Sequence, residues 1–277
     1  AGSIAAVQAL HQSYLYVQGP PGAGKTYTGS RMIVSLLQQG KRVAIMSNSH
    51  KAINNLLEGV MKVQAGMGLS HRAVKKCSRG NEDSECHDER FLIENIADNA
   101  EVYGSLAPLV AGTVWLFSSE ELDQSFDYLF VDEAGQVALA NLLAAGTCAR
   151  NIVLLGDQMQ LSQPVQGVHP GRSGESALDY LLDGAATIAS DRGIFLGTTF
   201  RMHPQVCRFI SDAVYDSRLE PEPTNVHRAL VLKPDANPWL KPAGIVHVPV
   251  DHRGCSQSSE AEAKRVVEIY QSALTQQ

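Results

Sequence analysis

Gly19-Pro-Pro-Gly-Ala-Gly-Lys25-Thr26 is the stretch of sequence that decides the fold. It follows an apolar run at residues 14–17 and precedes a segment with helical periodicity. Strand, glycine-rich loop and helix therefore come in the order that a phosphate-binding loop requires. Glycines let the backbone turn successive N–H groups onto one anion, and the start of the helix adds unpaired donors. An ordinary glycine-rich turn has no reason to end in Lys-Thr, so the stretch predicts a site for a nucleoside triphosphate.

Two side chains of this loop have distinct expected roles. Lys25 is expected to reach the β- and γ-phosphates, and the hydroxyl of Thr26 is expected to bind Mg²⁺. Further contacts to the nucleotide are expected from Gly19, Pro20, Pro21, Gly22, Ala23, Gly24 and Tyr27.

The rest of the chain alternates apolar runs with amphipathic segments. Strands are predicted at residues 42–47, 108–117, 126–131 and 151–155, and helices near 32–37 and 52–61. Strands that alternate with helices at this spacing indicate a parallel sheet covered by helices on both faces. The predicted fold class is therefore α/β.

Two domains are expected. The first spans residues 1–190 and the second, incomplete, spans 191–277. The second is expected to open with a strand at 193–200, which a strand at 244–249 and a helix at 260–274 follow after an irregular, proline-rich connection.

Residues 64–104 interrupt the alternation. They are polar, carry mixed charge and lack a clear apolar period, so we expect an insertion with a little helix that lies outside the sheet. Cys77, Cys86, His71 and His87 offer metal-ligating atoms, but they contain no tight Cys-x₂-Cys pair. Ordinary loop residues are the favoured interpretation, and a metal site is the alternative.

The bulk composition limits the class of protein. The chain has 277 residues, and no apolar run approaches the roughly 18 residues of a membrane span. Its five cysteines are odd in number and scattered, which favours reduced thiols in the cytoplasm over a disulfide framework. A net charge of −6 counts against broad coating of nucleic acid, but not against a narrow groove lined by hydroxyls and amides. The chain lacks an initiator Met, so we expect a piece of a longer protein.

Acidic and amide side chains follow the two strands at 126–131 and 151–155. Asp132 is the expected second ligand of Mg²⁺, and Glu133 is expected to polarise the water that attacks the γ-phosphate. Gln160 can accept from that water or donate to the γ-phosphate. Two solvated acids at a strand end are common in isolation, but the glycine-rich loop upstream makes the functional interpretation the stronger one.

Thr199-Phe-Arg-Met-His-Pro204 is the most informative distal stretch. Arg201, at a strand end in a second domain, is placed as an arginine finger requires, whereas a salt bridge beside a helix is the alternative. Phe200 could stack on the face of the nucleotide base.

The order of these motifs resembles superfamily 1 helicases, in the group of the nonsense-mediated-decay helicases and the nuclease–helicases of DNA replication. The matching stretches are Gln18-Gly-Pro-Pro-Gly-Ala-Gly-Lys-Thr26 for motif I, Ser47-Asn-Ser-His-Lys-Ala52 for motif Ia, Gly112-Thr113 for motif Ic, Asp132-Glu-Ala-Gly-Gln136 for motif II, Gly156-Asp-Gln-Met-Gln-Leu161 for motif III and Phe200-Arg-Met-His-Pro204 for motif IV. The DEAG form of motif II and the stretch 163–170 look most like bacterial proteins that fuse a RecB-like nuclease to such a helicase.

This resemblance implies a RecA-like P-loop domain, a partial second RecA-like domain, and ATP with Mg²⁺ as cofactors. It implies that Lys25, Thr26, Asp132, Glu133, Gln160 and Arg201 form the catalytic set, and that Phe200 takes the place of an adenine-stacking tyrosine. It also implies that Ser47, Asn48, Ser49 and Thr113 contact the sugar–phosphate backbone of a single strand, DNA or RNA. A fused or associated nuclease is a further implied partner. The resemblance implies no interaction with a membrane.

Two departures from the family pattern matter. An adenine-reading glutamine is expected near residue 2, where this chain has Gly2, and motifs V and VI are absent. We therefore expect the chain alone to bind ATP, to hydrolyse it weakly and not to unwind.

The function implied for the full-length protein is 5′-to-3′ helicase or translocase activity on single-stranded nucleic acid. A P-loop ATPase that acts as a switch or remodelling subunit is the alternative, distinguished by ATP hydrolysis that nucleic acid does not stimulate. A passive single-strand-binding module is a second alternative, and the catalytic set speaks against it.

Overall fold

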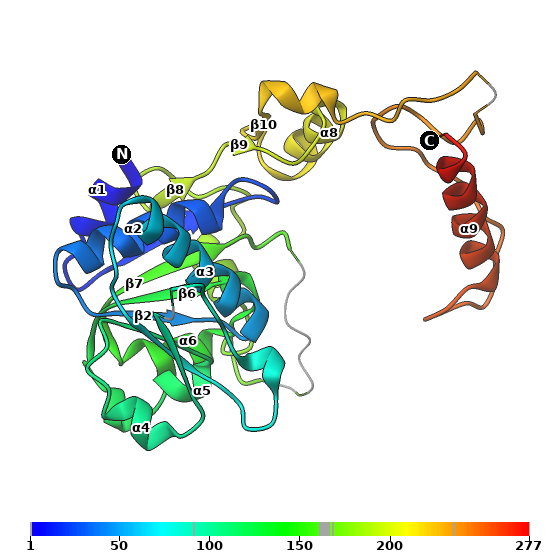
Figure 1. Cartoon of the computed structure of the whole chain (residues 1–277). Helices are drawn as coiled ribbons and strands as arrows, with labels where there is room; N and C mark the ends of the chain where they lie inside the picture. Colours follow the sequence, from blue (N-terminus) through cyan, green and yellow to red (C-terminus); the bar gives the residue numbers. More distant parts are fainter. Residues whose placement is uncertain (1, 91, 161–166, 168, 235, 277) are drawn as a thin grey trace. The chain divides into compact units, whose positions relative to one another are not determined.

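Parallel strand pairing builds one large sheet in the N-terminal part of the chain. The computed structural model describes residues 2–90, 92–160, 167, 169–234 and 236–276. The chain divides into two units, Ala1–Gly197 and Thr198–Gln277. In the first unit the strand order is β4-β3-β5-β2-β6-β7-β1-β8, and every neighbouring pair is parallel (Figure 1). The strands are β1 (Tyr14–Gln18), β2 (Val43–Met46), β3 (Ala73–Lys76), β4 (Ile93–Ile96), β5 (Leu109–Gly112), β6 (Phe126–Asp132), β7 (Ala149–Gly156) and β8 (Gly193–Phe195).

Helices cover both faces of this sheet. One face carries α1 (Gly2–Gln8), α2 (Lys25–Gln38) and α3 (His50–Gly66). The other carries α4 (Asn99–Tyr103), α5 (Val114–Phe117), α6 (Leu139–Gly146) and α7 (Ala177–Leu182). Short 3₁₀ turns lie at η1 (Glu82–Ser84), η2 (Glu120–Leu122) and η3 (Ala134–Gln136).

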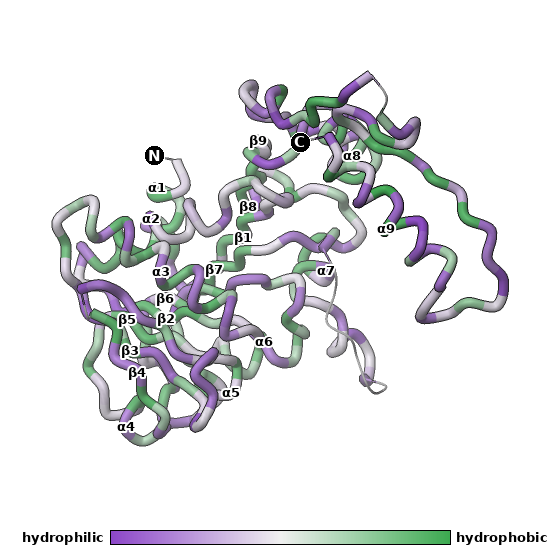
Figure 2. Tube along the Cα trace, turned by 45° about the vertical axis from the view of Figure 1, so that its right-hand side comes forward, coloured by the Kyte–Doolittle hydropathy of each residue, from purple (hydrophilic) through white to green (hydrophobic). Residues whose placement is uncertain are grey.

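Alternation along the strands fills two cores. In β1, Leu15 and Val17 pack with α1–α3, whereas Tyr16 packs with the helices of the opposite face. Burial on both faces explains why the central strands are almost continuously apolar, as the tube of Figure 2 shows in green. The predicted α/β fold with a two-sided parallel sheet is confirmed.

The prediction that residues 64–104 lie outside the sheet is wrong. β3 pairs with β5, and β4 pairs with β3, so this segment supplies two strands at one edge. Both strands have only four residues and mixed polarity. β4 lies at the edge of the sheet and is largely half-buried, whereas β3, one strand further in, is mostly buried although it carries Lys75 and Lys76.

Three other expected strands also differ. β8 forms within 193–200, but it pairs with β1 in the first unit instead of opening the second. In 108–117 the strand stops at Gly112, and α5 follows. Residues 244–249 form no strand, and no strand of the described part of the second unit pairs with them.

The second unit has little regular structure. A two-stranded parallel pair joins β9 (Thr198–Thr199) to β10 (Glu220–Pro221), with α8 (Pro204–Val214) and η4 (Pro223–His227) in the same region. Cys207, Tyr215 and Leu219 are buried there. The predicted C-terminal helix is present as α9 (Glu260–Leu274), and none of its residues is buried.

The two cores lie wholly within residues 1–197, so we expect a chain that ends at residue 197 to unfold cooperatively by itself. A chain that ends at residue 190 lacks β8 and the partly buried Ile194 and Leu196, which pack on the core of α1–α3. It should be less stable by about 1–3 kcal/mol, the usual contribution of such side chains. Urea unfolding of the two truncated chains checks this, and equal midpoints would contradict the placement of β8.

Candidate nucleotide-binding site

The loop between β1 and α2 has the curled backbone of a phosphate cradle. Gly22 and Gly24 have φ angles of 77° and 84°, in the left-handed region that favours glycine. The Gly19 amide donates to the carbonyl of Gly156 on β7 (2.9 Å), which anchors the start of the loop. A Cβ built on Gly19 would lie 2.3 Å from Cγ of Lys25, so only glycine lets this side chain cross the loop.

Lys25 and Thr26 open α2 at the end of this loop. The Lys25 ammonium donates to the carbonyl of Gly19 (2.5 Å) and so lies inside the curl. The methyl group of Thr26 faces Gly59 of α3, because a Cβ built on Gly59 would lie 3.3 Å from it. The Thr26 hydroxyl is therefore directed to another side of the helix.

The acid pair lies at the end of β6. Asp132 is 5% exposed, and its Oδ1 accepts the amide of Glu133 (3.0 Å). The pKa of Asp132 is raised to about 6, chiefly by burial and also by the charge of Glu133, against the lowering effects of the Glu133 amide hydrogen bond and the Lys25 charge. Lys25 and Asp132 therefore act on each other across the site. Carboxylate and hydroxyl oxygens are ligands that Mg²⁺ prefers, so the residue types of Asp132 and Thr26 suit the predicted metal role, which stays a prediction.

Motif III packs directly on motif II. A Cβ built on Gly135 would lie 2.7 Å from the carbonyl oxygen of Asp157, and one on Gly156 would lie 3.1 Å from the amide of Gly135. The two loops are thus in backbone contact at positions where only glycine fits. Glu133 has a φ of 53°, an unusual left-handed conformation for a non-glycine residue. The Gln160 side chain is exposed on the motif III loop, and the backbone N–H of Gln160 donates to the carbonyl of Asp157 (3.3 Å).

A buried amide network that no local sequence pattern reveals lies beneath these loops. The Gln18 side chain donates to Oε1 of Gln158 (2.9 Å) and to the carbonyl of Ala186 (2.9 Å), and it accepts the amide of Ile188 (2.7 Å). Gln158 also donates to the carbonyl of Ala186 (2.8 Å). The network therefore ties the first residue before the phosphate loop to motif III and to the segment that leads into β8.

The residues predicted to contact a nucleic-acid strand follow β2 and β5. Ser47 is completely buried, and its Oγ accepts the amide of Ser49 (3.5 Å), so it presents no hydroxyl at the surface. Asn48 donates to the carbonyl of Gln136 (2.6 Å), which links motif Ia to motif II. Ser49 caps α3, and Thr113 immediately precedes α5.

Arg201 and Phe200 belong to the second unit. Both are exposed, and the Thr199 hydroxyl accepts the amides of Arg201 (3.3 Å) and Met202 (3.4 Å). Their predicted roles at the nucleotide stay predictions. The stretch 163–170 lies mostly outside the described residues, as does Leu161.

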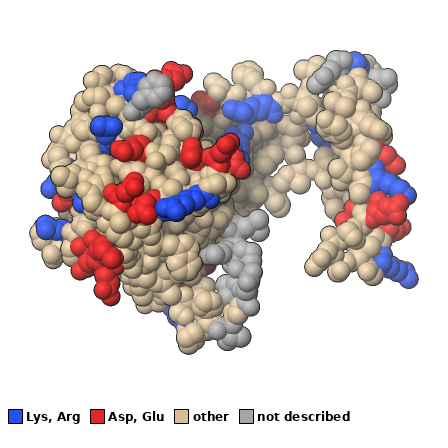
Figure 3. Space-filling model, turned by 60° about the horizontal axis from the view of Figure 1, so that its bottom comes forward, with Lys and Arg blue, Asp and Glu red and all other residues tan. Residues whose placement is uncertain are grey.

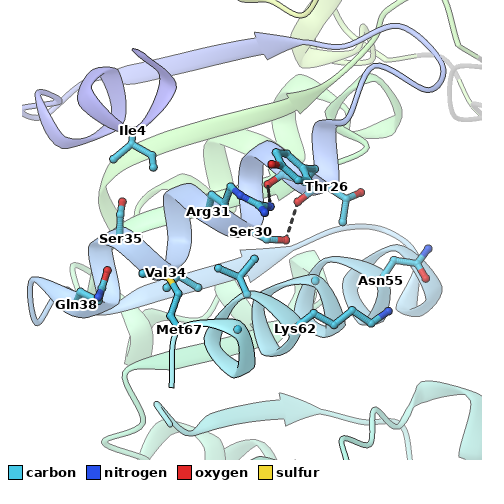
Figure 4. A pocket seen from close by; sticks show the side chains of 14 residues that line it. Ile4, Thr26, Ser30, Arg31, Val34, Ser35, Gln38, Asn55, Lys62 and Met67 are labelled. Atoms are coloured by element: carbon cyan, nitrogen blue, oxygen red, sulfur yellow. Dashed lines mark hydrogen bonds between the residues drawn. The ribbon is translucent and has the colours of Figure 1, made fainter. Parts of the chain in front are cut away.

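A groove of about 780 Å³ begins at the start of α2 (Figure 4). It runs between α2 and α3 beside Ile4 of α1, and Thr26 and Tyr27 line one end. The Tyr27 ring is 63% exposed, and the Arg31 guanidinium lies 3.4 Å from its centroid. An aromatic ring beside the phosphate loop offers a surface on which a nucleotide base can stack.

Within the described ranges, no group of three or more His, Cys, Asp or Glu side chains is placed to hold a metal ion. Cys77 donates to Oδ1 of Asn95 (3.2 Å), and burial raises the pKa of Cys77 and of Cys86. None of the described helices is long and apolar enough to span a bilayer.

The sheet, the curled loop and the buried acid at the end of β6 define the class of protein. Such an arrangement is a P-loop domain of the RecA-like fold.

Comparisons with known proteins give the family. A family model described as an AAA domain matches residues 2–173. The "DNA replication ATP-dependent helicase/nuclease DNA2" of Gallus gallus is 26% identical over 216 residues, 76% of this chain and 21% of that protein. The "DNA replication ATP-dependent helicase/nuclease JHS1" of Arabidopsis thaliana is 27% identical over 237 residues, 83% of this chain and 17% of that protein.

Among solved structures, a complex of arterivirus nonstructural protein 10 (helicase) with DNA has a TM-score of 0.50. It is 18% identical and covers 84% of this chain and 46% of that one, so it supports the fold. The family model covers more than half of the chain, which therefore belongs to this AAA-domain family and, with these relatives, to superfamily 1 of the helicases. The chain spans about a fifth of the length of the DNA2 relatives.

The buried acid gives a prediction about stability. The pKa of Asp132 is raised from 3.8 to about 6 in the folded state, so ionising this carboxyl lowers the free energy of unfolding. The loss of stability is absent below pH 3.8 and is complete once the pH exceeds about 6. Asp132→Asn should therefore stabilise the nucleotide-free protein by at most about 3 kcal/mol at pH 8, since one pKa unit corresponds to about 1.4 kcal/mol.

Thermal unfolding of both proteins at pH 8 and pH 5 measures this difference. The gain should shrink at pH 5, and a variant that is less stable than wild type at pH 8 would contradict the electrostatic interpretation.

Proposed function

We propose that this helicase-family ATPase core moves along single-stranded nucleic acid in the 5′-to-3′ direction as part of its longer protein. The observation that carries the proposal is the buried Asp132, which acts electrostatically on Lys25 while its loop packs against motif III. A change of the bound nucleotide at the phosphate loop can therefore alter the conformation of motif II after β6 and, through backbone contacts, of motif III after β7.

The chain's residues have separate proposed roles. The phosphate loop and Lys25 bind the triphosphate, Thr26 and Asp132 hold Mg²⁺, and Mg²⁺ when bound neutralises phosphate charge. Glu133 orients and polarises the attacking water, and Gln160 contacts the γ-phosphate. Arg201 is the proposed arginine finger, and Tyr27 and Phe200 are the proposed contacts to the base.

The proposed strand contacts are polar rather than strongly basic. Asn48, Ser49 and Thr113 follow strands β2 and β5 at the same sheet edge as motif II, whereas the buried Ser47 is better assigned to holding that loop. Figure 3 shows acidic and basic side chains interspersed on the face of the first unit that it presents. Hydroxyl and amide groups such as those of Asn48, Ser49 and Thr113 can position a single strand without reading its sequence, which supports a narrow track.

The proposal extends to the surroundings of the chain. The relatives include helicase/nucleases, which supports a nuclease fused to or associated with the full-length protein. All five cysteines are free, which supports a reducing compartment such as the cytoplasm. The second unit is proposed to be part of a second RecA-like domain.

Two substitutions separate nucleotide binding from turnover. Lys25→Ala should weaken binding of Mg²⁺-ATP by at least about tenfold, because it removes the cation inside the phosphate loop. Glu133→Gln should keep the affinity while blocking turnover, because an amide cannot take the proton of the attacking water. Titration calorimetry and steady-state phosphate release measure the two effects. Unchanged affinity in Lys25→Ala would sink the P-loop assignment, and a normal rate in Glu133→Gln would remove Glu133 from its role.

The experiment that tests the motor is ATP hydrolysis by the full-length protein that contains this chain, with single-stranded DNA, single-stranded RNA or no polymer. We expect strong stimulation by one of the polymers, and loss of all hydrolysis in Lys25→Ala. Robust hydrolysis that neither polymer stimulates would instead support a P-loop switch without translocation.

A further inference from the structure

Lys75 is a lysine with no exposed surface, at a position in β3 that the sequence analysis did not single out. Burying an ammonium group is costly unless all three of its N–H donors find acceptors. The Lys75 ammonium meets this condition with Nδ1 of His50 (2.9 Å), the carbonyl of Lys76 (2.9 Å) and the carbonyl of Ser84 (3.0 Å). This side chain therefore joins the start of α3 to the loop that follows β3.

The contact with Lys75 determines the state of His50. A charged Lys75 can only donate to Nδ1 of His50, and this requires the ring proton of His50 on Nε2 and a neutral imidazole. Burial lowers the pKa of His50, and the charges of Lys75 and Lys76 lower it further. Burial lowers the pKa of Lys75, and the charge of Lys76 lowers it further. Ionised Cys77 and Cys86 would raise the pKa of Lys75, but burial raises the pKa of both thiols.

The loop after β3 is itself held in place. Ser84 is fully buried; its hydroxyl accepts the amide of Ser78 (2.9 Å) and donates to the carbonyl of Asn81 (2.6 Å). Ser78 is exposed, and its Oγ lies 3.4 Å from Nε2 of His50. That long contact to a rotatable hydroxyl is one that a stronger acceptor can replace.

The sheet places His50 beside the other proposed strand contacts. It is the first residue of α3, directly after Ser49. On the neighbouring strands, Lys76 lies against Gly112, since a Cβ built on that glycine would be 3.3 Å from Cβ of Lys76. Gly112 precedes Thr113, so the ends of β3, β5 and β2 form one continuous edge.

We propose that His50 is a further contact for the nucleic-acid strand, donating its Nε2–H to a phosphate oxygen of the sugar–phosphate backbone, and that Lys75 is the buried positioning residue that fixes the imidazole for this contact. The inference rests on the proposed function, because it extends the same strand track. A neutral donor adds a hydrogen bond to phosphate without adding a cation, so it strengthens binding without displacing a further counterion.

Two substitutions of His50 separate its proposed Nε2–H contact to phosphate from its Nδ1 contact to Lys75. Asparagine has an oxygen near the position of Nδ1 but cannot reach the position of Nε2, whereas glutamine can place an N–H donor there. His50→Asn should lower the affinity for a fluorescent single-stranded oligonucleotide by about three- to tenfold, and His50→Gln should stay within about twofold of wild type. The slope of log affinity against log salt should be unchanged in both. His87→Ala is the control, because it removes another exposed histidine, one that pairs with Glu85.

A spectroscopic measurement tests Lys75 without nucleic acid. Long-range ¹H–¹⁵N spectra of the wild-type protein should show His50 as the neutral Nε2–H tautomer, and Lys75→Met should convert it to a mixture with a higher pKa. A purely packing role of Lys75 would leave tautomer and pKa unchanged.

The outcomes separate this inference from the proposed function. Three results would overturn the inference alone. The first is wild-type affinity in His50→Asn, and the second is a salt slope that the substitution reduces by about one phosphate contact. The third is a wild-type spectrum in which His50 is charged or carries its proton on Nδ1. No binding of single strands by the wild-type protein would overturn both, whatever the tautomer.

Discussion

The backbone contact between the loops after β6 and β7 is the constraint on which the site depends. Gly135 approaches the carbonyl of Asp157 so closely that a single methyl group would separate the loops. Asp132, Glu133 and Gln160 therefore hold their relative positions through main-chain contacts rather than through flexible side chains. The left-handed backbone at Glu133 belongs to the same arrangement, since strained conformations persist where packing determines them.

Buried and half-buried polar side chains extend this constraint along the carboxyl edge of the sheet. Gln18 holds motif III and the segment before β8, Asn48 holds motif II from the end of β2, and Lys75 holds the start of α3 from β3. Each of these side chains is costly to bury without its partners, so each contact specifies one arrangement of two loops. Movement of one loop must therefore exchange hydrogen bonds with its neighbours.

The sequence predicts some of these elements well and others poorly, for physical reasons. The phosphate loop, the central strands and α3 were predicted because long apolar periods and left-handed glycines leave a strong local pattern. β3 and β4 were missed because four residues of mixed polarity carry no clear period, and β8 was given to the wrong unit because its partner lies far upstream in β1.

Lys75 is the clearest example of a feature that the local sequence cannot predict. Lysine is usually exposed, and Lys75 is buried only because residues 25 positions earlier and 9 positions later supply acceptors. Ser47 shows the converse: its motif was recognised, but the fold turned its hydroxyl inward. Local pattern identifies which strand ends carry the site, and tertiary packing decides which side chains reach it.

The net charge of −6 is compatible with strand binding at the carboxyl edge of the sheet, because the proposed contacts there are neutral. A chain that bound a strand mainly through surface cations would need a broad basic face, and on the one face that Figure 3 presents the charges are interspersed instead. The proposed amide, hydroxyl and neutral imidazole donors would hold phosphate oxygens without a large fixed charge, so each contact would be weak and short-ranged. A strand held by many weak neutral contacts can be released one contact at a time. That property suits a strand that must shift whenever the loops around the nucleotide exchange their hydrogen bonds.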